Sequence, residues 1–155
     1  MKNVEIRLVA SESEFEDLDE LFWKVLWEPL GLPRDIRKTF VVEGEGVDLI
    51  AVNGSSVIGG ISANWIFPFE VDLRHLAVIP EFQRNNIGSL MVKKLISIVS
   101  QRNCVIIRTI ARNTSSEFFK MLGFVPSADG NVPEHPAFKK HGISFEMLEI
   151  SRAKF

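Results

Sequence analysis

The feature that most constrains this fold is a strand, a short polar loop and a long amphipathic helix in direct succession. Residues Val71–Ile79 are rich in apolar side chains and stop at Pro80, and Ile87–Val99 carries apolar residues at helical spacing. A second β-branched segment, Cys104–Ile110, follows this helix. Central strands that alternate with helices predict an α/β fold in which a mixed sheet has helices on its faces.

Other segments add strands and helices around this unit. The spacing of their residues predicts strands at Val4–Val9, Val47–Val52, Val57–Ala63 and Ile143–Ile150, and an extended piece at Phe124–Val125. The dipeptide Asn53-Gly54 between the second and third strands is typical of a hairpin.

Helix-start and helix-stop residues mark the remaining helices. Ser11 and Glu14 form a capping-box pattern before an amphipathic helix that we expect to stop before Pro29. A short helix is predicted at Ser115–Leu122, closed by Gly123, and a loop at Ser127–Gly142.

Length and composition bound the class of protein. The 155 residues suit a single domain, 1–155, and the formal net charge of −2 offers no basic stripe to nucleic acid. The single cysteine, Cys104, and the three histidines form no metal-binding spacing. No signal peptide or apolar run of about 20 residues is visible. We therefore expect a cytoplasmic protein that holds no metal and has no nucleic-acid or membrane partner.

The loop before the long helix has the features of an anion site. A helix N-terminus presents unpaired N–H groups and a partial positive charge. Asn85, Asn86, Gly88 and Ser89 are small or tolerant of left-handed backbone, so the chain can approach an anion closely. A pyrophosphate suits this loop, but an ordinary strand-to-helix connection explains the same residues.

The segment also resembles motif A of the GNAT acetyltransferase superfamily. The similarity lies in Ala77-Val78-Ile79-Pro80-Glu81 followed by Gln83-Arg84-Asn85-Asn86-Ile87-Gly88. Asn86 stands where the family usually has its first glycine, and Asn is the next residue best able to adopt that backbone.

A second similarity lies downstream, in the order that the family has. Residues Ala111 to Phe124, with Asn113, Phe118 and Leu122-Gly123-Phe124, resemble motif B. Together the two motifs imply a mixed, mostly antiparallel sheet of about six or seven strands flanked by about four helices.

The resemblance implies an N-acetyltransferase that uses acetyl-CoA as cosubstrate. A primary amine, on a small molecule or a peptide, would attack the thioester directly, and homodimers are frequent in the family. By this resemblance the cofactor-binding residues are Leu76, Ala77, Val78, Gln83, Arg84, Asn85, Asn86, Ile87, Gly88, Ser89, Asn113 and Phe119.

Asp72 is the favoured general base. It has the same strand parity as Leu76 and Val78, so we expect these side chains to share a face, whereas His75 would lie on the other. A surface pairing of Asp72 with Arg74 explains the residue equally simply. Glu70 is a further candidate of the same parity.

The general acid is harder to place. The chain has no tyrosine, and Phe119 occupies the position where the family usually has a tyrosine that acts as the general acid. Water, Ser115 or Ser116 would have to supply the proton. The alternative is a CoA-binding sensor or regulatory protein with weak or no catalysis.

Two histidines of the late loop, His135 and His141, are further candidates. Either would border the acceptor in such a fold, or be a solvated loop residue.

Overall fold

One mixed sheet organises the chain. The computed structural model describes residues 3–40, 43–127 and 132–155. Its seven strands have the order β1-β2-β3-β4-β5-β7-β6, and of the pairs described only β4 and β5 run parallel. The predicted mixed, mostly antiparallel sheet is therefore confirmed. The strands are β1 (Val4–Leu8), β2 (Gly46–Asn53), β3 (Ser56–Trp65), β4 (Glu70–Val78), β5 (Ile106–Arg112), β6 (Val125–Pro126) and β7 (Phe145–Ser151).

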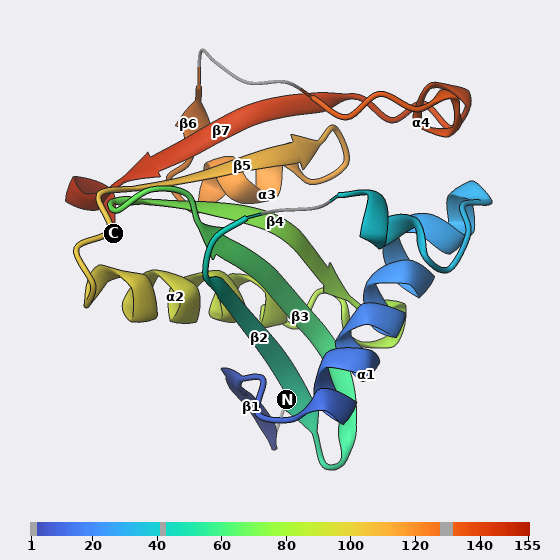
Figure 1. The fold of residues 1–155 in the computed structure, drawn as a ribbon, viewed down its shortest axis with the longest axis horizontal. Helices are drawn as coiled ribbons and strands as arrows, with labels where there is room; N and C mark the ends of the chain where they lie inside the picture. The colour runs from blue at the N-terminus through green and yellow to red at the C-terminus, as the bar shows by residue number, and fades with distance from the viewer. Residues whose placement is uncertain (1–2, 41–42, 128–131) are drawn as a thin grey trace.

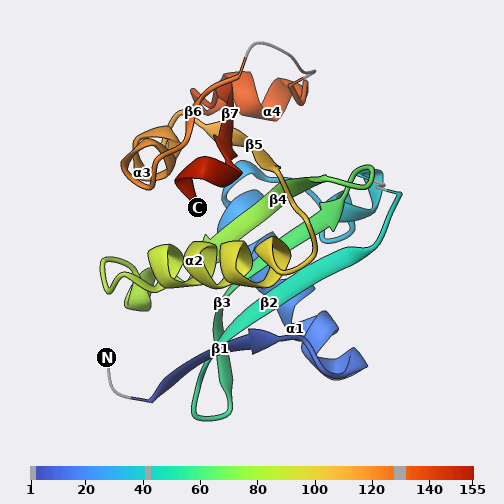
Figure 2. The same ribbon diagram turned by 90° about the vertical axis from the view of Figure 1, so that its left-hand side faces the viewer.

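Helices cover both faces of this sheet (Figures 1 and 2). α2 (Ile87–Ser100) and α3 (Ser116–Met121) pack on one face, over a core that includes Leu49, Ile61 and Leu95. α1 (Glu12–Phe22) and α4 (Pro136–Lys140) cover the other face, over a second core that includes Leu18 and Phe138. Within the described ranges, no helix is both long and apolar enough to cross a membrane.

The parallel pair at the centre of the sheet is short. β4 and β5 pair only over Glu70–Leu73 and Ile106–Thr109. The Thr109 hydroxyl donates a buried hydrogen bond of 3.0 Å to Leu73 O where the pairing ends. Beyond this point β4 continues beside β3 and β5 continues beside β7, so the two strands diverge (Figure 1).

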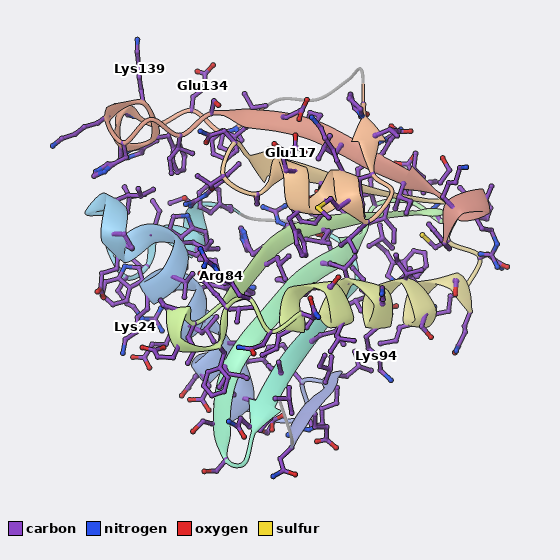
Figure 3. The ribbon with its side chains drawn as sticks, turned by 180° about the vertical axis from the view of Figure 1, so that it is seen from behind. Lys24, Arg84, Lys94, Glu117, Glu134 and Lys139 are labelled. Atoms are coloured by element: carbon purple, nitrogen blue, oxygen red, sulfur yellow. The ribbon has the colours of Figure 1, made fainter. Side chains whose placement is uncertain are left out.

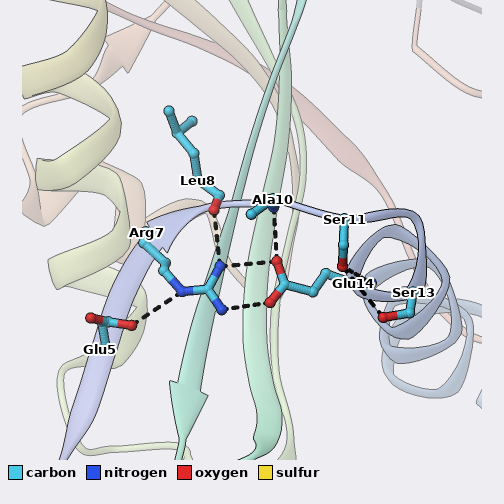
Figure 4. A network of polar contacts seen from close by, with 7 residues as sticks. All are labelled: Glu5, Arg7, Leu8, Ala10, Ser11, Ser13 and Glu14. Atoms are coloured by element: carbon cyan, nitrogen blue, oxygen red, sulfur yellow. Dashed lines mark hydrogen bonds and ion pairs between the residues drawn. The ribbon is translucent and has the colours of Figure 1, made fainter.

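The predicted start of the first helix is confirmed. The Ser11 hydroxyl accepts a hydrogen bond from the backbone N–H of Glu14, so Ser11 is the N-cap. The Glu14 carboxylate accepts from Ala10 N–H and from both terminal nitrogens of Arg7 on β1 (Figure 4). The hydrogen bond from Arg7 lowers the pKa of Glu14 to about 2. This network joins the helix to the edge strand.

The first helix ends before Pro29, as predicted, and short helical turns follow it. α1 passes at Phe22 into a π-helical turn, Trp23–Trp27, and then a 3-10 turn, Glu28–Leu30, which contains Pro29. Proline is tolerated there because the first residues of a helical turn need no N–H partner. The chain reverses at Gly31, where φ is 75°.

The expected late loop also contains helix. α4 occupies Pro136–Lys140, and Nδ1 of His135 accepts a hydrogen bond from Ala137 N–H as its N-cap. Cys104 is buried before β5, which begins at Ile106 rather than at the cysteine.

Close packing of α1 on the sheet depends on Gly60 of β3. A Cβ added at Gly60 would lie 2.1 Å from Leu18 Cδ1 and 3.0 Å from Leu49 O. The glycine therefore lets the helix rest directly on the backbone of the strand.

We predict that Gly60→Ala lowers the free energy of unfolding by about 1–3 kcal/mol, because overpacking displaces α1. Urea unfolding measures this effect. Gly46→Ala is the matched control, since its added Cβ would meet only the end of a side chain, Asp48 Oδ2, at 3.1 Å. Equal losses in the two variants would contradict the close approach of α1.

Candidate active site

A cleft opens where β4 and β5 diverge. It is lined by Asp72 to Leu76 of β4, by Thr109 to Arg112 of β5 and by residues of the π-helical turn, α3 and α4. The cleft thus collects segments from both faces of the sheet. The chain brings polar groups to it from strands whose backbones no longer bond each other.

A β-bulge at Arg74 sets which side chains face which side. His75 is paired with Ser62, but Leu73 is paired with Ala63, so β4 has one extra residue between them. Side chains alternate along a regular strand, and the extra residue reverses the alternation. Asp72 and His75 consequently share the α1 face, and Leu76 and Val78 lie on the α2 face.

Two expectations of the sequence analysis are therefore wrong. Asp72 does not share a face with Leu76 and Val78, and His75 is not on the face opposite Asp72. The parity argument assumed an unbroken strand. A bulge moves every later residue to the other face, and nothing in the local sequence marked its place.

Beyond the bulge, β4 has free backbone N–H donors on its side away from β3. Alternate residues of an antiparallel strand direct their N–H and C=O groups to opposite sides. Ile79 N–H donates to Ile58 O, so the N–H groups of Leu76 and Val78 point away from β3. Within the described ranges neither N–H has an acceptor, since β5 has already diverged.

The loop that follows has the backbone shape that the sequence predicted. Asn86 has φ 62° and ψ 14°, in the left-handed region that an asparagine tolerates. Its side chain does not cap α2, so the first N–H groups of the helix at Ile87, Gly88 and Ser89 have no intrahelical acceptor. These donors and the positive end of the helix face the same loop, as an anion site requires.

Three side chains support this loop. Gln83 Nε2 donates to Val78 O at 2.8 Å, and the Asn85 amide donates to Phe82 O and Gln83 O. Arg84 also has a left-handed backbone, with φ 68°, and its side chain extends from the loop before α2 (Figure 3). It contributes a positive charge to the loop.

α3 forms the neighbouring wall. A Cβ added at Gly88 would lie 3.2 Å from Phe118 Cζ, so α2 and α3 approach closely at the glycine. Phe119, which lines the cleft, is buried and packs edge-on against Phe118 and Phe124. Ala77 lies on the opposite side, against the core beneath α1.

Asp72 contributes a carboxylate to the lining of the cleft. It is half-buried, and burial raises its pKa, against the opposing effects of Arg74 and Arg108. Glu70, the other candidate base, is bound by Arg108 Nη1 at 2.7 Å and does not line the cleft. Asp72 is therefore the better placed of the two to accept a proton.

His75 lies among aromatic rings. Its ring centroid is 4.9 Å from that of Trp27, 5.5 Å from Phe22 and 6.0 Å from Phe40. Burial lowers its pKa to about 3, and the positive charges of nearby arginines add to this effect. The imidazole is thus neutral at physiological pH.

The remaining candidates have defined positions. Both polar groups of the Asn113 side chain are engaged, since Nδ2 donates to Gly142 O and Oδ1 accepts from Ser144 N–H. Ser115 lines the cleft, but Ser116 does not. His135 caps α4 and His141 follows it, and neither lines the cleft.

The sequence analysis did not assign site roles to two cleft residues, Arg74 and Arg112. Arg112 Nη2 donates to Leu26 O in the π-helical turn at 2.8 Å, and Arg74 Nη2 donates to Phe40 O at 3.1 Å. Arg112 lies within the stretch that resembles motif B and Arg74 lies shortly before motif A, but neither is a residue to which the motifs give a role. Across the described ranges, no cluster of His, Cys, Asp or Glu suits a metal ion.

Comparison with known proteins identifies relatives of this architecture. Residues 11–124 match the model of the acetyltransferase (GNAT) family. An aminoglycoside 6'-N-acetyltransferase complexed with coenzyme A is similar over 95% of this chain and 96% of its own, with 16% identity and a TM-score of 0.74.

Two further solved structures have the same fold. The ribosomal-protein-S18-alanine N-acetyltransferase of Escherichia coli has a TM-score of 0.70 at 13% identity, over 94% of this chain and 90% of its own. The PaiA N-acetyltransferase of Thermoplasma acidophilum, in complex with coenzyme A, has a TM-score of 0.67 at 19% identity, over 96% and 98%.

We predict that Asn86→Val destabilises the protein by about 1–2 kcal/mol, because a β-branched residue is strained in left-handed backbone. Urea unfolding measures the change. Asn86→Gly is the control and should be at least as stable as the parent, since glycine adopts this conformation freely. Similar losses in both variants would mean that the backbone of Asn86 is not what matters.

His75 should also make stability depend on pH. Its folded pKa of about 3 lies below the ordinary 6.5, so the unfolded chain binds more protons between these values. The contribution of His75 to the free energy of unfolding is therefore complete above pH 6.5. It falls on acidification, by at most about 1.4 kcal/mol per pH unit.

Urea unfolding of the parent and of His75→Gln across this range isolates the contribution, because the other titrating groups are common to both. The parent should lose stability more steeply than the variant as the pH falls. Parallel curves would show that His75 does not stay neutral in the folded protein.

Proposed function

The chain belongs to the acetyltransferase (GNAT) family, and from this membership we propose that it moves an acetyl group from acetyl-CoA to a primary amine by direct attack. We further propose that residues 1–155 act as one catalytic domain. The observation that carries the proposal is the pair of free N–H groups at Leu76 and Val78, directly before the uncapped N-terminus of α2.

The residues present fit a CoA molecule. Its pyrophosphate would be held by the N–H groups of the loop and of the first turn of α2, at Arg84 to Ser89, with the Arg84 side chain as a counter-ion. The extended pantetheine arm carries amide groups that match the free backbone donors of the diverging β4. Acetyl-CoA supplies the activated acetyl group, as a thioester.

Within this arrangement Leu76 N–H is the donor for the thioester oxygen, because it points into the cleft beside Asp72. A fixed backbone donor stabilises negative charge that grows on that oxygen during attack, and does so without having to reorient. Val78 N–H, on the same side of β4 and next but one along the strand, would hold the pantetheine arm.

Asp72 is proposed as the general base. As the amine nitrogen forms its bond to the acetyl carbon and the carbon–sulfur bond breaks, the amine loses a proton to Asp72, directly or through a water. Burial raises the pKa of this carboxyl, which brings it closer to the pH range in which a base is most effective. Glu70 is less suitable because Arg108 already binds it.

The departing thiolate must also gain a proton. Phe119 has none to give, and it is packed into the α3 core. Ser115 lines the cleft, and its hydroxyl, which donates to Arg112 O at 3.3 Å, is the proposed donor, with water as its substitute. A free thiol has a pKa near 8.5, so this step needs little assistance. The absence of a tyrosine also favours a second candidate, a CoA-binding regulatory protein without turnover.

We predict that Asp72→Asn lowers kcat by about 10²–10⁴-fold and leaves acetyl-CoA binding intact, because the amide cannot accept the proton. Release of free thiol measures turnover, and calorimetry measures binding, with ATP as the ligand that should not bind. Glu70→Gln is the matched control and should retain turnover.

Two results would count against parts of this proposal. Unchanged turnover in Asp72→Asn would remove Asp72 as the base. Binding of acetyl-CoA with no turnover of any amine would favour the regulatory candidate over the enzyme.

A further inference from the structure

The α1 side of the cleft is rich in positive charge. Arg37, Arg74 and Arg112 all lie close enough to His75 to lower the pKa of its imidazole. They come from three separate elements: the 3-10 turn Ile36–Thr39, the bulge of β4 and the end of β5. The fold therefore gathers three guanidinium groups on the side where the amine would approach Asp72.

One of these three charges is already neutralised. Arg37 Nη1 pairs with Asp19 at 3.0 Å, and its Nη2 donates to Ser62. Arg74 and Arg112 are different, because within the described ranges no carboxylate lies within ion-pair distance of either. Asp72 is near Arg74 but makes no bond to it.

Both free guanidinium groups are held in place and remain partly unbonded. Arg74 donates through Nη2 to Phe40 O, and Arg112 donates through Nη2 to Leu26 O. Each guanidinium has five N–H donors, so further donors remain for a ligand. Both residues are half-buried and line the cleft, and burial lowers the pKa of each.

A structural role alone explains this arrangement poorly. A guanidinium kept out of water is costly unless an anion or several acceptors compensate it. A hydrogen bond to a single backbone carbonyl offsets only part of this desolvation cost for each arginine. Arg74 and Arg112 both line this cleft, and the planar guanidinium of an arginine binds a carboxylate through its fork of N–H donors.

Apolar groups complete the surroundings. The same part of the cleft is walled by Trp27, Phe40 and Phe138, and Arg112 lies 5.8 Å from the centroid of the Phe138 ring. An acceptor that fits there has an amine for Asp72, an anion for the arginines and an apolar body for the rings.

We propose that the acceptor is an α-amino acid with an apolar side chain, whose carboxylate is bound by Arg74 and Arg112 while its amine faces Asp72. This proposal rests on the proposed acetyltransferase function, and it specifies the acceptor class. A polycationic acceptor, such as a polyamine or an amino sugar, would meet like charge instead. An internal or N-terminal residue of a peptide lacks the α-carboxylate that the arginines bind.

The test compares each amino acid with its own carboxamide. The pairs are L-phenylalanine, L-leucine and L-methionine, each with its own amide. The two members of a pair have the same amine and side chain, and only the acid carries a negatively charged carboxylate. Thiol release from acetyl-CoA gives kcat/KM for each compound. Calorimetric titration of the CoA-saturated protein gives its affinity independently of turnover.

We expect the full chain to prefer at least one acid over its amide by about 10- to 100-fold, the usual range for a charge-assisted hydrogen-bonded pair. Arg112→Gln and Arg74→Gln should each bring this ratio close to one. Arg112→Lys should give an intermediate ratio, because it keeps the charge and loses the fork.

Lys139→Gln is the matched control. It removes the same charge from α4 beside the cleft, but its side chain points away from the protein (Figure 3), so the ratio should not change. Thermal melting of every variant tests that each is folded, and the ratio is compared within one variant.

Three results would overturn the proposal. The first is a kcat/KM for the amides that equals or exceeds that for the acids. The second is an acid-to-amide ratio that Arg74→Gln and Arg112→Gln leave unchanged. The third is a protein that binds acetyl-CoA but binds neither the amino acids nor their amides. Failure to bind acetyl-CoA at all would instead overturn the proposed function itself, so the two failures are distinguishable.

Discussion

The site depends on the early end of the pairing between β4 and β5. Parallel strands normally form hydrogen bonds along their whole length, yet here the ladder stops at Leu73 and Thr109. At this point the threonine hydroxyl donates a hydrogen bond to the Leu73 carbonyl. Among the described residues, the later N–H groups of β4 on that side, those of Leu76 and Val78, have no backbone acceptor. The bulge at Arg74 coincides with this point, and it increases the local bend and twist of the strand.

That single irregularity also arranges the charges. Because of the extra residue, Asp72, Arg74 and His75 all come to the side covered by α1, whereas Leu76 and Val78 present their side chains to α2 and their N–H groups to the side away from β3. The proposed base and the proposed cosubstrate donors thus lie on one strand and point in different directions. The first helix contributes its π-helical turn, whose Leu26 carbonyl holds Arg112 across the opening.

Much of the fold followed from local patterns. The Asn53-Gly54 hairpin, the Ser11 cap and the left-handed backbone of Asn86 were predicted because each depends on one or two neighbouring residues. The mixed sheet followed from the order of its elements. Irregular segments were not predicted: α1 leads into a π-helical turn, and α4 occupies part of an expected loop.

The sequence by itself determined the order of the elements, the left-handed backbone of the loop at Asn86 and the family, since these are encoded at short range. The faces of β4 and the neighbours of Asp72 were decided only by the tertiary structure. Side-chain direction on a strand alternates, so one inserted residue reverses it, and the place of a bulge depends on the register of β3 rather than on β4 alone. Arg74 and Arg112 line one cleft because β4 continues beside β3 and β5 continues beside β7, and no local pattern contains these pairings.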